Sequence, residues 1–160
     1  MDPDVCREHL SEVLVEEAAL LAELEYLLER EYQVLGSKDA AVMESTVRAR
    51  QERVGALARI EEQRRSLCSL HGYSADFAGL EGLMVWCDPE GSLVSRLREC
   101  ADRAANCRDL NDRNGTLVSA KLKRVEGLLG VLTGRRDKAD TYGPGGSTAS
   151  TDTGRVLGAA

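Results

Sequence analysis

The chain has 160 residues and a formal net charge of −6, with 42% hydrophobic, 30% charged and only 4% aromatic residues. This composition excludes a disordered chain, and apolar content made mostly of Leu, Val and Ala favours helices packed on helices over a β-sandwich. The acidic balance argues against nucleic acid as a partner. No apolar run is long enough to span a membrane, and the acidic N-terminus shows no signal peptide. We therefore expect a soluble, cytoplasmic, helical protein.

Two long helices are predicted in the N-terminal half. Asp2 followed by Pro3 is typical of a helix start, with an N-cap acid before a proline at the first helical position. Apolar residues then recur every three or four positions, which predicts a helix over 3–35. Residues 1–35 hold ten acids and two bases. We expect Gly36 to end this helix and Ser37 to cap a second one over 38–71.

A short apolar segment follows over residues 73–87. We expect a short helix starting after Ser74, weakened by Gly79 and Gly82. Such a segment is best explained as a hydrophobic lid over one end of a helical bundle.

The third long helix is predicted over 89–133, because Asp88-Pro89 repeats the opening pattern of the chain and Gly134 is a natural C-cap. Apolar and small residues alternate four- and three-residue steps from Leu93 to Leu132 without a break. This constant phase places Asn114-Gly115 inside the helix rather than in a hairpin turn. Asn111 and Asn114 take positions in the apolar seam, where they either fix the register of the helices or contact another protein.

The length of this helix predicts a binding surface. It spans roughly 68 Å against roughly 50 Å for each of the other two, so it would outrun them from about residue 123. An apolar stripe without an internal partner binds other proteins, and Gly127 and Gly130 suggest that this part becomes ordered on a partner. The residues of this distal stripe are Leu122, Val125, Leu128, Leu129 and Leu132.

These elements define an all-α fold. We predict an antiparallel bundle of three long helices plus a short connecting helix over residues 1–134. Residues 135–160 are mostly Gly, Ser, Thr, Asp and Ala, which cannot offset their ordering entropy by burial, so a flexible tail is expected there.

The side chains needed for catalysis or metal binding are missing from the pattern. The five cysteines are widely spaced and there are two histidines, which suits neither a disulfide framework nor a zinc site. We find no phosphate-binding glycine motif and no plausible Ser/His/Asp or Cys/His set. We predict no enzymatic activity, no metal and no cofactor, and we interpret the thiols as small buried side chains in a reducing compartment.

Residues 106–146 carry a recognisable combination of features. Asn111, Asn114 and Gly115 form an Asn-x-x-Asn-Gly step, an apolar run follows to Leu132, and Tyr142-Gly143 opens a glycine-rich tail. This combination resembles the C-terminal signature of the FlgN-type flagellar export chaperones. Over residues 1–72 the resemblance rests only on two long helices of suitable length and polarity.

The resemblance implies a function. Such a protein is a cytoplasmic chaperone of the flagellar type III export system that binds the C-terminal helical region of hook–filament junction proteins, largely through its own C-terminal part. It would prevent their premature assembly and deliver them to the export apparatus. The alternative is a generic coiled-coil scaffold or adaptor with no export role, which a stable obligate dimer that binds no junction protein would favour. A weak homodimer stays open under either interpretation.

Overall fold

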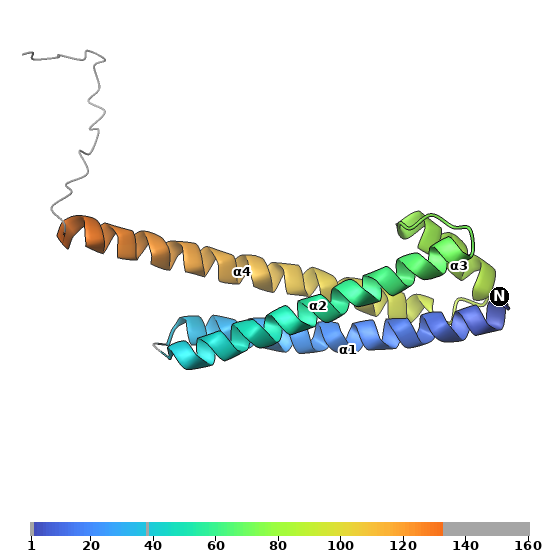
Figure 1. The fold of residues 1–160 in the computed structure, drawn as a ribbon, viewed down its shortest axis with the longest axis horizontal. Coiled ribbons are helices and arrows are strands. Elements are labelled where there is room, and N and C mark those ends of the chain that lie inside the picture. Colours follow the sequence, from blue (N-terminus) through green and yellow to red (C-terminus); the bar gives the residue numbers. More distant parts are fainter. Residues whose placement is uncertain (1, 38, 133–160) are drawn as a thin grey trace, which may run out of the picture. The chain divides into compact units, whose positions relative to one another are not determined.

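The computed structural model describes residues 2–37 and 39–132, which form four helices (Figure 1). They are α1 (Pro3–Leu35), α2 (Ala40–Leu70), α3 (Phe77–Cys87) and α4 (Val94–Leu132). The described ranges contain no strand, which confirms the all-α prediction. None of these helices combines the length and the apolar character needed to cross a membrane. The predicted tail over 135–160 and its boundary at Gly134 lie outside the described residues.

The chain divides into two compact units, Met1–Lys123 and Arg124–Ala160. The helical bundle belongs to the first unit. Of the second unit, the described part is the last stretch of α4, residues 124–132.

Helix α1 has the predicted bounds. The Asp2 carboxylate accepts a hydrogen bond from the backbone N–H of Asp4 at 3.0 Å, and Pro3 occupies the first helical position. At the other end, the backbone N–H of Gly36 donates to the carbonyl of Gln33 at 3.2 Å. The sequence signals at the two ends of α1 were therefore sufficient to predict its bounds.

The predicted cap of the second helix was wrong by two residues. Asp39 is the N-cap of α2, because its carboxylate accepts from the backbone N–H of Val42 at 3.1 Å. The Ser37 hydroxyl instead donates to the carbonyl of Val34 at 2.9 Å and so completes the end of α1.

Helix α3 covers one end of the bundle, as the lid interpretation predicted. Leu80, Leu83, Met84 and Cys87 are buried, and the helix packs on α1 and α2. It starts later than expected, after Asp76, whose carboxylate accepts from the backbone N–H of Gly79 at 2.8 Å. A Cβ on Gly79 would overlap the carbonyl of Ser74, so glycine permits the loop to pass close to the helix here.

The prediction that Asp88-Pro89 opens the last helix was also wrong. The Asp88 carboxylate accepts from the backbone N–H of Leu93 and from the Ser92 hydroxyl, each at 2.7 Å, and this bridges a turn rather than capping a helix at Pro89. Gly91 in that turn has a φ of +71°, which glycine adopts without strain. Helix α4 therefore begins at Val94.

The directions of the long helices follow from their contacts in the first unit. Pairs between α1 and α2 run in opposite order along the chain, Glu17 with Arg64 and Glu31 with Arg50. Contacts between α1 and α4 run in the same order, so α2 is antiparallel to both. Small and aliphatic side chains fill the core between them, among them Cys6, Leu10, Val13, Leu14, Leu21, Leu24, Leu28, Ile60, Leu67, Cys68, Leu93, Cys100 and Cys107.

Candidate protein-binding site

Helix α4 meets α1 through a row of small side chains spaced seven residues apart, which we call the inner row. The thiols of Cys100 and Cys107 donate to the carbonyls of Leu14 and Leu21 at 3.4 and 3.6 Å, and the Asn114 amide donates to the carbonyl of Leu28 at 2.9 Å. The accepting residues are also seven apart. A helix carbonyl has a second lone pair beyond its own helical hydrogen bond, so each of these contacts adds to the helix without breaking it. The repeat fixes the register of two parallel helices.

Asn114 also belongs to a polar cluster that joins all three long helices. Its amide lies 3.5 Å from the carboxylate of Glu31 on α1, which is itself buried. Glu31 forms an ion pair with Arg50 of α2 at 3.5 Å, and Arg50 donates to the side-chain oxygen of Asn111 at 3.2 Å. The two asparagines of the sequence motif are therefore linked through one residue from each neighbouring helix.

The two asparagines differ in burial. Asn114 is buried in the seam, as predicted, and its role in fixing the register stays a prediction. Asn111 is exposed, so its predicted place in the buried seam was wrong. It belongs to a second row on α4, the outer row, which also contains Leu97, Ala104 and Val118 at seven-residue spacing. Leu97, Ala104 and Asn111 of this row line hollows that residues of α2 also line.

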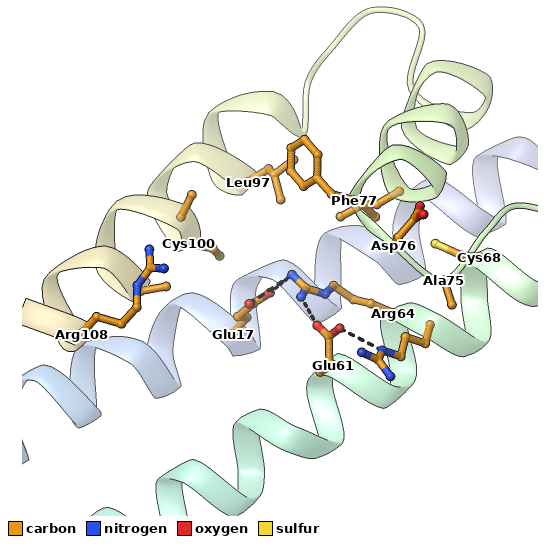
Figure 2. A pocket seen from close by; sticks show the side chains of 14 residues that line it. Glu17, Glu61, Arg64, Cys68, Ala75, Asp76, Phe77, Leu97, Cys100 and Arg108 are labelled. Carbon is orange, nitrogen blue, oxygen red and sulfur yellow. Dashed lines mark hydrogen bonds and ion pairs between the residues drawn. The ribbon is translucent and has the colours of Figure 1, made fainter. Parts of the chain in front are cut away.

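Two hollows lie between α2 and α4 above α1, and we call them together the groove. The larger has a volume of about 730 Å³ and is lined by Leu97, Ala101 and Ala104 of α4, by Glu61 and Arg64 of α2, and by Glu17 of α1 (Figure 2). The smaller, of about 380 Å³, is lined by Val54 and Arg50 of α2 and by Asn111 of α4. Arg108 lines both hollows, so they meet at this residue.

An ion-pair chain crosses the floor of the larger hollow. Arg64 donates to the Glu17 carboxylate at 3.0 and 3.2 Å and also pairs with Glu61 (Figure 2). Burial raises the pKa of Glu17 above its ordinary value although Arg64 acts to lower it. The hydrogen bond from Arg64 lowers the pKa of Glu61. These charges are satisfied within the protein.

The distal stripe is exposed to solvent. The exposed fractions are 58% for Leu122, 51% for Val125, 58% for Leu128, 53% for Leu129 and 81% for Leu132. All five lie on α4, which stays helical to Leu132. The overhang inferred from helix lengths stays a prediction.

Of the remaining motif residues, the structure describes Gly115 alone. Gly115 lies within α4, as predicted, and a Cβ placed there would meet no atom within 4 Å. Tyr142 and Gly143 lie outside the described residues.

All five cysteines are buried free thiols, which confirms their interpretation as small core side chains. Burial raises the pKa of Cys87 to about 12, and it raises the pKa values of Cys100 and Cys107 to about 11. Among the described residues, no three His, Cys, Asp or Glu side chains come together in a way that could hold a metal ion.

Sequence reasoning missed the groove. It treated the inner and outer rows of α4 as one stripe, gave no role to Arg108 and placed Phe77 in the hydrophobic lid. The outer row contained a sequence signal for the groove. Ala104 is too small and Asn111 is too polar for a helix interface packed by side chains of the same chain. Pairing the rows with their neighbours required the register that the structure supplies.

The fold defines a class of protein: a helical bundle whose exposed apolar stripe and hollows are formed by helix faces. The chain belongs to the FlgN family, a family of flagellar export chaperones, since the family model described as FlgN protein matches residues 1–150. This confirms the family suggested by residues 106–146 and extends the match to the N-terminal helices. No curated protein and no solved structure matched the chain.

Proposed function

We propose that this protein is a cytoplasmic chaperone that binds the C-terminal helical region of hook–filament junction proteins through the distal stripe. Membership of the FlgN family supports a role in flagellar export. The observation that carries the finer proposal is the exposed apolar surface of Leu122, Val125, Leu128, Leu129 and Leu132 on one helix. Large apolar patches on a folded protein mark interaction sites.

The mechanism is helix pairing. A junction-protein helix with an apolar face would self-associate when free, and the stripe covers that face until export. Binding requires no nucleotide and no metal, because burial of apolar area supplies the free energy. The chaperone then delivers the bound junction protein to the export apparatus.

Burial of the distal stripe can supply enough free energy for binding. Fully burying one leucine side chain contributes about 1.5–3 kcal/mol, and part of this is offset by the loss of freedom on association. A net contribution of about 3 kcal/mol from the stripe would change the dissociation constant more than a hundredfold.

A double substitution tests the stripe. Leu128→Asp with Leu132→Asp should abolish binding to the junction proteins encoded in the same genome, measured by titration calorimetry, while the melting temperature changes little. Ser119→Asp with Gly127→Asp is the matched control, since it adds the same charge at positions off the stripe, and a Cβ at Gly127 meets no atom within 4 Å. Leu14→Asp is the reference for core damage, because Leu14 is fully buried.

The outcomes separate the interpretations. A double variant that melts like Leu14→Asp places the stripe in the core and overturns the proposed site. A double variant that folds and binds normally places the binding surface elsewhere. A wild-type protein that forms an obligate dimer and binds no junction protein favours the scaffold alternative.

A further inference from the structure

The groove has the form of a helix-binding site. Its α4 wall is lined by Leu97, Ala101 and Ala104, and the two alanines leave space for another backbone to approach closely. In the larger hollow, Phe77 lies with Leu97 at one end and is 65% exposed, while Arg108 lies at the end that adjoins the smaller hollow (Figure 2). Val54, in the smaller hollow, is also exposed.

Two charged side chains that line the groove, Arg108 and Asp112 on successive turns of α4, form no ion pair within the described ranges. Arg64 and Arg65 pair with Glu61, and Arg50 pairs with Glu31. Arg108 is exposed and forms no ion pair or hydrogen bond with any residue in the described ranges. It stands where the two hollows meet, so an occupant of the groove would pass directly over it.

We propose that an amphipathic helix of the exported partner lies in this groove and places a carboxylate against Arg108, which completes a four-helix arrangement with α1, α2 and α4. The α4 wall from Leu97 to Asn111 corresponds to roughly 21 Å of helix, so the occupant contributes about four turns. The inference rests on the proposed function for the identity of the partner, and it assigns that partner a second contact surface apart from the distal stripe.

A second copy of this chain is a poorer occupant. One exposed apolar surface that a second copy could offer is the distal stripe, and the cations Lys121, Lys123 and Arg124 outnumber the one acid, Glu126, along residues 121–126. These cations would be brought toward Arg108, where like charges repel. The apolar face of the acidic helix α1 is already buried in its own core.

Two single substitutions test the groove, each with a matched control on α4. Arg108→Glu reverses the charge where the two hollows meet, and Arg98→Glu makes the same change at an exposed position outside both hollows. Ala101→Trp fills the groove from an exposed position, and Ser95→Trp adds the same side chain outside it. All four variants should keep the wild-type melting temperature, since none replaces a buried residue.

Binding is measured by titration calorimetry of the full chain with the purified junction proteins. Arg108→Glu and Ala101→Trp should each raise the dissociation constant about tenfold or more, and the effect of Arg108→Glu should shrink as salt is added. The two controls should bind like the wild type.

The failures are distinguishable. If Arg108→Glu and Ala101→Trp bind like their controls while the Leu128→Asp and Leu132→Asp protein does not bind, the groove is not a contact surface and the proposed function stands. If the wild type binds no junction protein, both proposals are overturned. If analytical ultracentrifugation shows that the wild type is a dimer and the groove variants are monomers, while junction-protein binding is unchanged, the occupant is a second copy and the partner assignment is wrong.

Discussion

The side-chain amide of Asn114 donates a hydrogen bond to the backbone carbonyl of Leu28 at 2.9 Å, as the third contact in a series that begins with Cys100 and Cys107. A shift of one residue between α1 and α4 would move each donor away from its acceptor. The amide is a stronger donor than the thiols, and it is the one nearest the end of α1. The Asn114 contact therefore carries most of the register information in the series.

Removal of the Asn114 amide should destabilise the bundle. Asn114→Ala loses the hydrogen bond to Leu28 and leaves space in a buried site, at a cost of about 1–3 kcal/mol in the free energy of unfolding. Asn114→Asp should cost more at neutral pH, because it places a second carboxylate beside Glu31 and the Leu28 carbonyl. Urea denaturation followed by circular dichroism measures both.

Asn111→Ala is the control for this pair, since Asn111 is exposed and its side chain accepts a hydrogen bond from Arg50 at the surface. Its effect should stay within about 0.5 kcal/mol. Equal losses for Asn111→Ala and Asn114→Ala would contradict the assignment of register to Asn114.

The buried thiols should resist alkylation in the folded protein. Burial raises the pKa values of Cys100 and Cys107 to about 11 and of Cys87 to about 12, so the reactive thiolate is scarce at pH 8, about one part in a thousand or less. Iodoacetamide should leave the native chain unmodified over minutes and modify all five cysteines in denaturant, as read by intact-mass spectrometry. Rapid modification of any one thiol in the native chain would show that its helix opens readily.

The Asp88 carboxylate in the turn before α4 should make the stability of the protein depend on pH. Burial acts to raise the pKa of Asp88, but the hydrogen bonds from Leu93 and Ser92 lower it below its ordinary 3.8. A lowered folded-state pKa contributes stability above the unfolded value, and this contribution is lost as the pH falls through the folded value. Asp88→Asn should therefore cost about 1–2 kcal/mol at pH 7.

The difference between wild type and Asp88→Asn should shrink below about pH 4, as both side chains become neutral. Thermal melts between pH 3 and pH 7 measure it. A constant difference over this range would mean that the charge on Asp88 does not contribute.

The sequence predicted the helices more reliably than their caps and neighbours. The apolar period and the Asp2-Pro3 start were enough for α1, because these signals are local. Ser37 and Asp88 were misassigned because Ser and Asp cap helices and also close turns, and the choice depends on which backbone N–H comes within reach.

The candidate site was predicted in part for a similar reason. The apolar character of residues 122–132 and the Asn-x-x-Asn-Gly step are visible in the sequence. The separation of α4 into an inner row, which contacts α1, and an outer row, which lines the groove, depends on the register between helices. Residue spacing alone does not contain that register, so Arg108 could not be assigned before the structure.

Removing Arg64 should cost more stability than removing the charge of Glu17, although the two residues form one ion pair. Glu17 accepts from Arg64 alone among the described residues, whereas Arg64 also pairs with Glu61. Arg64→Ala leaves a mostly buried carboxylate without its cation and should cost about 2–3 kcal/mol at pH 7. Glu17→Gln leaves Arg64 with a partner and should cost about 1 kcal/mol or less. Urea denaturation at pH 7 measures both changes.

The pH dependence identifies the cause of the loss in Arg64→Ala. Burial already raises the pKa of Glu17 above its ordinary 4.5, and loss of the cation raises it further. A raised folded-state pKa gives stability that is fully present below the unfolded value and is lost as the pH rises through the folded one. The deficit of Arg64→Ala should therefore be largest at pH 7, should narrow as the pH falls toward about 4.5 and should be smallest below that value. Arg65→Ala, which removes an exposed partner of Glu61, is the control and should show a small deficit. If the deficit of Arg64→Ala were the same at pH 4 and pH 7, lost packing of the arginine stem would explain it better than the unpaired charge.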